Sequence, residues 1–260
     1  MPVEVLQDRV ILCHPKGSRV EILLYGATIT SWKSGSLQDA TPIERLFLSS
    51  KAALDGSKPV RGGIPVVFPC FGAPTLPEHA KLKQHGFARS EKWSWNKTVM
   101  DNETGVSISL ALEPTEEIRR IYDRPFHLLY VVTLAEHQLR TDLHVTNIST
   151  FPPDTLEFQA LLHKYIQAPA NKLVVTPLQN LFYYDKTETT EEEKAKPKVE
   201  QRVGVDVKKH TDSVYVNASQ NYEIIWPGGQ MVITSKNLKD VVVWNPQDEG
   251  RKISDMEEGG

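Results

Sequence analysis

The chain has 260 residues, which is long enough for one large β-sandwich domain. Its 30 Lys and Arg residues nearly balance 33 Asp and Glu residues, and the formal net charge of -3 excludes a whole-protein field that attracts nucleic acid or acidic membranes. We therefore expect neither a nucleic-acid partner nor a membrane partner.

The cysteines and the N-terminal residues indicate the compartment. Cys13 and Cys70 are too few for a disulfide framework in a chain of this length. The N-terminal stretch MPVEVLQDRV carries charges where a signal peptide needs an unbroken apolar run. A reduced, cytoplasmic protein is expected.

Period-two alternation of apolar residues dominates the chain and predicts antiparallel strands with one solvent-facing side. The alternation is clear at Val106, Ile108, Leu110 and Leu112. In chain order, strands are expected within residues 19–33, 106–114, 124–135, 137–147, 154–167, 171–185, 219–236 and 238–246. The sequence therefore predicts an all-β fold.

Two segments depart from this alternation. Residues 114–122, PTEEIRRIY, predict a short helix, with Glu116 and Glu117 at the end where the helix dipole favours acids. Residues 186–201, KTETTEEEKAKPKVEQ, are charge-dense without apolar periodicity and predict a mobile charged loop. Because this segment indicates a loop between strands and no domain boundary, we expect a single domain over residues 1–260.

Two cationic segments punctuated by glycine follow each other closely. In KPVRGGIPVVFPCFG, residues 58–72, Arg61 precedes a glycine pair that would let the backbone turn tightly and approach a ligand. In KQHGFARSEKW, residues 83–93, His85 precedes a glycine and Arg89 follows it. Paired guanidinium groups typically bind a dianionic phosphate, whereas an isolated arginine is more often part of a structural ion pair. The pair by itself is a weak indication.

Three residues have both a structural and a functional interpretation. His163 follows two leucines on a predicted strand, where a hydrogen-bonded core histidine is the ordinary explanation. His85 lies in a predicted loop, where contact with a ligand is easier. Asp212 follows the charged segment, and a surface turn is its ordinary setting. No histidine has the spacing of a metal ligand, and the sequence lacks P-loop, GxGxxG and GxSxG motifs.

Five stretches form an ordered set across nearly the whole chain. They are DGSKPVRGGIPVVFPCFG, KQHGFARSEKW, LLHKYIQ, TDSVY and VVVWNP. In order and spacing this set resembles the glucose-6-phosphate 1-epimerase family, the hexose-6-phosphate mutarotases. The resemblance implies a galactose mutarotase-like β-sandwich, or supersandwich, of large antiparallel sheets with its site in a cleft on a concave face. The strands predicted from alternation agree with such a fold.

The resemblance implies a role for each candidate residue. Arg61 and Arg89 match positions that bind the 6-phosphate. His85 matches a histidine that contacts the sugar near the reacting centre, and His163 matches the general acid that protonates the ring oxygen. Asp212 matches an aspartate that hydrogen-bonds sugar hydroxyls. The role implied for His163 replaces its interpretation as a core histidine.

The implied activity is interconversion of the α and β anomers of hexose 6-phosphates. A base removes the proton of the anomeric hydroxyl while an acid protonates the ring oxygen, so that the sugar opens to the aldehyde and recloses on its other face. This chemistry needs neither a metal nor a redox cofactor. A hexose 6-phosphate is the expected small-molecule partner, and the protein is expected to be a monomer.

The resemblance has one departure, near Gly260. In the family the general base is a glutamate in a segment similar to VEPG, which lies after the WNP motif. This chain reads VVVWNPQDEGRKISDMEEGG there, so we expect a C-terminally truncated sandwich without that glutamate and without its last strands. Neither Glu257 nor Glu258 matches the position of the base. The chain is then a shortened and impaired form of an active enzyme, a catalytically inactive protein that binds phosphosugars, or a fold remnant without a ligand.

Overall fold

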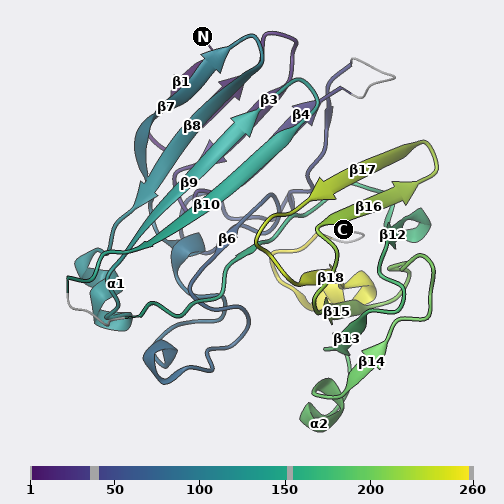
Figure 1. Cartoon of the computed structure of the whole chain (residues 1–260). Helices are drawn as coiled ribbons and strands as arrows, with labels where there is room; N and C mark the ends of the chain where they lie inside the picture. The colour runs from purple at the N-terminus through teal and green to yellow at the C-terminus, as the bar shows by residue number, and fades with distance from the viewer. Residues whose placement is uncertain (1, 36–40, 151–154, 258–260) are drawn as a thin grey trace. The chain divides into compact units, whose positions relative to one another are not determined.

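The chain folds into two compact units, Met1–Gln167 and Ala168–Gly260. Figure 1 shows the computed structural model, in which strands predominate and helices are short. None of the described helices is long and apolar enough to cross a membrane. The structure describes residues 2–35, 41–150 and 155–257. The single domain expected from the sequence stays a prediction.

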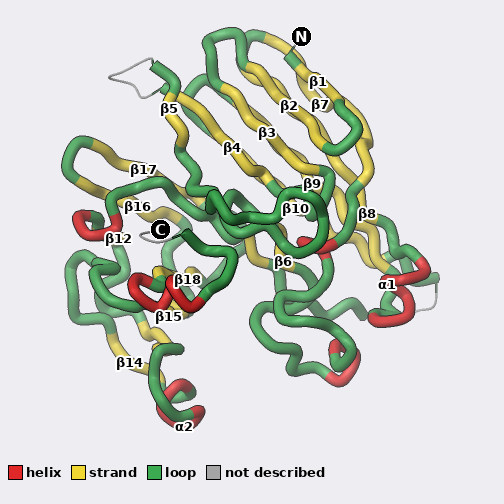
Figure 2. The backbone as a smooth tube through the Cα atoms, turned by 180° about the vertical axis from the view of Figure 1, so that it is seen from behind, coloured by secondary structure: helices red, strands yellow, loops and turns green. Residues whose placement is uncertain are grey.

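The first unit contains two large antiparallel sheets. Figures 1 and 2 view the molecule from opposite sides, and each shows one of these sheets in front of the other. One sheet, in spatial order, consists of β1 (Val3–Val5), β2 (Arg9–Cys13), β3 (Arg19–Leu23), β4 (Ile29–Ser34) and β5 (Ile43–Glu44). The other, in spatial order, consists of β10 (Leu139–Asn147), β9 (Phe126–Leu134), β8 (Gly105–Leu112) and β7 (Ser94–Asn102).

The apolar core of the first unit is built from alternate side chains of both sheets, because successive residues of a strand point to opposite faces. On β9 every second residue is buried, from Phe126 through Tyr130 to Leu134. Val10 and Leu12 of β2 belong to the same buried cluster. Burying one such large side chain stabilises the fold by about 1.5–3 kcal/mol. The sandwich is therefore a stable scaffold for the loops that carry the candidate site.

Strand β8 is buried on both faces, so the predicted solvent-facing side is wrong there. Ser107 and Ser109 lie on its second face and are each 2% exposed. Ser107 Oγ forms a hydrogen bond with Thr133 Oγ1 at 2.8 Å, and the side-chain amide of Asn96 donates to Ser109 Oγ at 2.9 Å. Small hydroxyl groups satisfied in this way can be buried in an interior strand. Apolar–serine alternation therefore does not prove that one face is solvated.

The predicted strand over residues 154–167 is mostly irregular in its described part. Only β11 (Leu161–Leu162) is a strand, and it pairs with β6 (Val66–Val67). Farther along, His163 N–H donates to the carbonyl of Pro65 at 3.1 Å. Because proline has no N–H to return a bond, the ladder is interrupted there. The paired segment is therefore short, and His163 lies just beyond its end.

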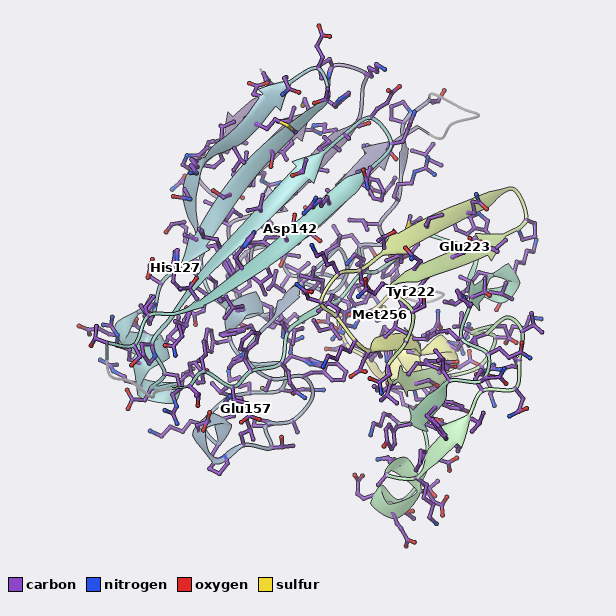
Figure 3. All side chains as sticks on the ribbon, viewed as in Figure 1. His127, Asp142, Glu157, Tyr222, Glu223 and Met256 are labelled. Atoms are coloured by element: carbon purple, nitrogen blue, oxygen red, sulfur yellow. The ribbon has the colours of Figure 1, made fainter. Side chains whose placement is uncertain are left out.

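The second unit contains two smaller antiparallel sheets. One, in spatial order, consists of β12 (Val174–Thr176), β16 (Asn221–Trp226) and β17 (Gly229–Thr234). The other, in spatial order, consists of β14 (Pro197–Val199), β13 (Phe182–Asp185), β15 (Thr211–Tyr215) and β18 (Val241–Asn245). Tyr222 and Glu223, labelled on β16 in Figure 3, show the alternation in this unit, since Tyr222 is buried and Glu223 is exposed.

Both short α-helices begin after a threonine that caps them. The side-chain oxygen of Thr115 accepts a hydrogen bond from Ile118 N–H at the start of α1 (Glu116–Ile121), which confirms the helix predicted over residues 114–122. Thr190 plays the same part for α2 (Glu191–Lys194). Helix α2 was not predicted, because its sequence has no apolar periodicity.

Helix α2 and strand β14 lie within residues 186–201, for which the sequence predicts a loop. The charges of this segment are paired with one another: Lys194 contacts Glu191 at 2.8 Å, and Lys196 contacts Glu193 at 2.7 Å. Pairs three residues apart support a helical turn without apolar contacts. The prediction that residues 186–201 lack regular structure is therefore wrong.

Candidate active site

The glycine pair after Arg61 lets three backbone segments lie close together. Gly62 has φ +121°, and a Cβ added to it would lie 2.6 Å from Leu48 Cα. Gly63 has φ +66°, and its added Cβ would lie 2.1 Å from the carbonyl oxygen of Ile29. Both positions require glycine because a side chain has no room. The close approach predicted for a ligand is thus made by the protein's own backbone, and it fixes the place of Arg61.

The second cationic segment is anchored in the same way. Gly86 has φ +69°, and an added Cβ would lie 2.1 Å from the carbonyl oxygen of Phe68. The N–H groups of Phe87 and Ala88 both donate to that oxygen, at 3.1 Å and 3.3 Å. The tight turn holds His85 on one side and the short 3-10 helix that carries Arg89, Ala88–Ser90, on the other.

His85 is fixed in one tautomer. The backbone N–H of Gly72 donates to His85 Nδ1 at 3.0 Å, so the ring proton of the neutral imidazole lies on Nε2. Burial, with the charges of Arg89 and Arg61, lowers the pKa of His85 from its ordinary value of 6.5 to about 4. At neutral pH His85 can therefore donate from Nε2 but cannot accept there.

His163 lies just beyond β11 with its ring stacked on that of Tyr165, at a centroid distance of 4.3 Å and an interplanar angle of 19°. Burial, together with the charges of His85, Arg61 and Arg89, lowers the pKa of His163 from its ordinary value of 6.5 to about 4. Such mutual influence requires proximity. The first unit therefore brings together four of the five residues singled out from the sequence.

Arg89 contributes a buried donor to this cluster. Its Nη2 donates to the carbonyl of Gln84 at 2.9 Å, while its Nε is buried without a hydrogen-bond partner among the described residues. Burial and the charge of Arg61 lower the pKa of Arg89, although a guanidinium stays protonated in proteins. A buried charged donor without a partner is costly, and an anionic ligand would satisfy it.

Tyr165 is a site residue that sequence reasoning missed. Arg61 Nη1 donates to the phenolic oxygen of Tyr165 at 3.3 Å, and the tyrosine ring stacks on His163. The signal was present in the stretch LLHKYIQ, because residues two apart in an extended segment share a face. An aromatic residue two positions after the candidate acid could have been examined for that reason.

Asp212 belongs to the second unit, on β15 opposite Trp244 of β18. Burial raises the pKa of its carboxyl group, while His210 and Lys186 lower it. Its carbonyl oxygen accepts a hydrogen bond from Lys186 N–H at 2.7 Å. Its predicted contact with sugar hydroxyls stays a prediction. Glu258, which was set aside as a base, lies outside the described residues.

Comparison with known proteins identifies the family. The family model described as aldose 1-epimerase matches residues 8–259. The chain belongs to the aldose 1-epimerase family. Its members are isomerases that act on small sugars, which agrees with the mutarotase resemblance of the five stretches and confirms the family expected from them.

Individual members of the aldose 1-epimerase family are moderately similar to the chain. A protein of Cenchrus ciliaris named "Putative glucose-6-phosphate 1-epimerase" is 31% identical over 94% of this chain and 72% of its own length. A protein of Escherichia coli (strain K12) with the same name is 30% identical over 47% of this chain, a match that spans only 38% of the bacterial protein.

A solved structure shows the same fold. The crystal structure of a "putative mutarotase (YeaD)" from Salmonella typhimurium superposes with a TM-score of 0.81 at 23% identity, covering 98% of this chain and 80% of the other. This similarity confirms the predicted all-β, galactose mutarotase-like fold of antiparallel sheets.

Proposed function

We propose that this aldose 1-epimerase acts on hexose 6-phosphates and interconverts the α and β anomers of glucose 6-phosphate. The observation that carries the proposal is the buried Nε of Arg89, a charged donor without a partner in the described structure, in a cluster that also contains Arg61. Two guanidinium groups offer a dianion several charge-assisted hydrogen bonds. The names of the two relatives given above agree with a phosphorylated substrate.

In the proposed mechanism the phosphate also favours the protonated form of His163, the general acid. Its two negative charges, bound at Arg61 and Arg89, offset the positive field that depresses the pKa of His163 and so raise that pKa from about 4. The imidazolium of His163 then gives its proton to the ring oxygen O5 as the C1–O5 bond breaks. His85 donates from Nε2 to a sugar oxygen near C1.

The proton balance closes over one cycle. A base takes the proton of the C1 hydroxyl as the C1–O5 bond breaks, which leaves the aldehyde and a C5 hydroxyl. After rotation about C1–C2 the C5 hydroxyl attacks the other face of C1 and returns its proton to His163, and the base returns its proton to the new anomeric oxygen. No described residue is assigned as this base, and the predicted impairment of the 260-residue chain stays a prediction.

Anomer exchange of glucose 6-phosphate, followed by NMR, tests the proposal. The chain should accelerate exchange over buffer, although less than an enzyme that has the family's base, and His163→Gln should lower the remaining acceleration by up to about 10²–10⁴-fold, the usual contribution of one proton-transfer group. His144→Gln, an exposed histidine on β10, is the control and should leave exchange unchanged. Equal rates for the His163 and His144 variants would contradict the assigned acid. Saturable binding without any exchange would instead support an inactive phosphosugar-binding protein.

A further inference from the structure

Tyr165 contacts two candidate site residues with two different parts of its side chain. Its phenolic oxygen accepts from Arg61 Nη1 at 3.3 Å. Its ring lies nearly parallel to the imidazole of His163, at 4.3 Å between centroids and 19° between planes. The residue expected to bind phosphate and the residue expected to protonate the sugar are therefore joined by one side chain.

Backbone hydrogen bonds on both sides of Tyr165 fix the position of its Cα atom, from which the side chain extends. Its N–H donates to the carbonyl of Gly63 at 2.9 Å, and its carbonyl accepts from Phe47 N–H at 3.0 Å. Gly63 is one of the two glycines that anchor the segment after Arg61. Arg61 and Tyr165 are thus fixed through the same backbone pairing, which favours a constant distance between their side chains.

We propose that Tyr165 is a positioning residue that holds the Arg61 guanidinium for the phosphate and the His163 imidazole for the ring oxygen. This inference rests on the proposed function and assigns to the tyrosine two separable tasks. The hydroxyl restrains a flexible arginine, which would otherwise lose rotamer entropy when phosphate binds. The ring restricts rotation of the imidazole and shields it from water.

Two substitutions separate the tasks. Tyr165→Phe removes the hydroxyl and keeps the ring, so affinity for inorganic phosphate and for glucose 6-phosphate should fall about tenfold, the effect of one lost hydrogen bond to a charged group. Affinity for glucose should stay the same, and so should the pKa of His163. Tyr165→Leu removes the ring as well and should also raise the pKa of His163 from about 4 towards 6.5, because water reaches the imidazole.

The experiment is calorimetric titration with inorganic phosphate, glucose 6-phosphate and glucose, combined with an NMR titration of the His163 ring. Tyr122→Phe is the matched control, because its hydroxyl is buried in the same unit without a hydrogen-bond partner in the described structure. This variant should bind all three ligands as the wild type does. A thermal melt of each variant confirms that the fold is kept.

The outcomes distinguish the inference from the function on which it rests. Wild-type phosphate affinity in Tyr165→Phe would overturn the role of the hydroxyl, and an unchanged His163 pKa in Tyr165→Leu would overturn the role of the ring. Both results leave the proposed function standing. A wild-type chain that binds neither phosphate nor glucose 6-phosphate would overturn the proposed function, and the role of Tyr165 with it.

Discussion

The backbone N–H of Gly72 donates a hydrogen bond to Nδ1 of His85 at 3.0 Å. That contact requires an unprotonated Nδ1, which the low pKa of His85 secures at neutral pH. With its remaining proton on Nε2, this imidazole can stabilise a sugar oxygen but cannot take a proton from the anomeric hydroxyl. The geometry therefore separates the work of His85 from that of the general base.

The two histidines make the protein less stable in mild acid. His85 and His163 each have a folded-state pKa of about 4, below the ordinary 6.5, so the unfolded chain binds more protons between these pH values. The free energy of unfolding should fall as pH drops from 6.5 towards 4, by at most about 1.4 kcal/mol per pH unit for each histidine. Urea unfolding at a series of pH values measures the slope.

Substitution of each histidine tests whether these two residues cause the pH dependence of the free energy of unfolding. His85→Asn, chosen because asparagine tolerates the φ of +69° at this position, and His163→Gln should each make the slope shallower. His144→Gln on β10 should leave it unchanged, since that side chain is exposed. A slope that stays the same when both site histidines are replaced would rule out this explanation.

Bound phosphate should raise the pKa values of both histidines. A dianion at Arg61 and Arg89 adds negative charge to a cluster in which the nearby charges are positive. NMR titration of the imidazole rings with and without inorganic phosphate gives the shift directly. Replacing both arginines by alanine should abolish the phosphate-dependent part, whereas a shift that persists in this double variant would place the anion elsewhere.

Gly86→Ala should be strongly destabilising. The new methyl group would lie 2.1 Å from the Phe68 carbonyl oxygen, at a residue whose φ is +69°. Gly228→Ala is the control, because Gly228 has φ +87° and nothing within 4 Å of its added Cβ. We expect a loss of more than about 3 kcal/mol for Gly86→Ala and about 1 kcal/mol for Gly228→Ala in urea unfolding. Equal losses would mean that only the backbone conformation matters.

Glu200 is a buried carboxylate that stabilises the second unit. Its carboxylate is bonded to the side chain of Arg202 at 2.8 Å and to the hydroxyl of Tyr215 at 2.7 Å. Burial alone would raise the pKa of Glu200, but these donors and the N–H of Arg202 lower it to about 2. The stabilisation is therefore complete above pH 4.5 and is lost as pH falls towards 2.

Glu200→Gln should reduce the free energy of unfolding by about 1–2 kcal/mol at neutral pH, because the hydroxyl of Tyr215 and the partly exposed side chain of Arg202 lose a carboxylate partner that is only 3% exposed. Glu223→Gln, at the exposed position labelled in Figure 3, should change it by less than about 0.5 kcal/mol. Similar losses in the two variants would show that the Glu200 network contributes nothing.

The sequence predicted most strands because their alternation reflects burial on one face. Strands β9 and β17 follow this pattern directly. The prediction failed where another interaction replaced apolar burial: a hydrogen bond between a serine of β8 and a threonine of β9, and local ion pairs around α2. Alternation also could not reveal that Pro65 leaves His163 beyond the end of β11, because that depends on which segments pair.

The candidate site was predictable only through the resemblance of its motifs. Arg61, His85, Arg89 and His163 come from separate segments, and spacing alone left His163 as a core histidine. Tyr165 escaped notice because no chemical property of an isolated tyrosine distinguishes it, and its part depends on contacts with Arg61 and His163. Folding brings such contacts together across about a hundred residues, as the separation of 104 between Arg61 and Tyr165 shows.

Two arginines select the phosphorylated sugar in the proposed function, and binding of glucose 6-phosphate compared with binding of glucose in Arg61→Ala tests this selection. Arg140→Ala is the control, because Arg140 is exposed and paired with Asp142 on β10, labelled in Figure 3. We predict that Arg61→Ala weakens binding of glucose 6-phosphate by about 10²-fold and leaves glucose binding unchanged. Arg140→Ala should leave the binding of both sugars unchanged. Equal weakening of both sugars would contradict the claim.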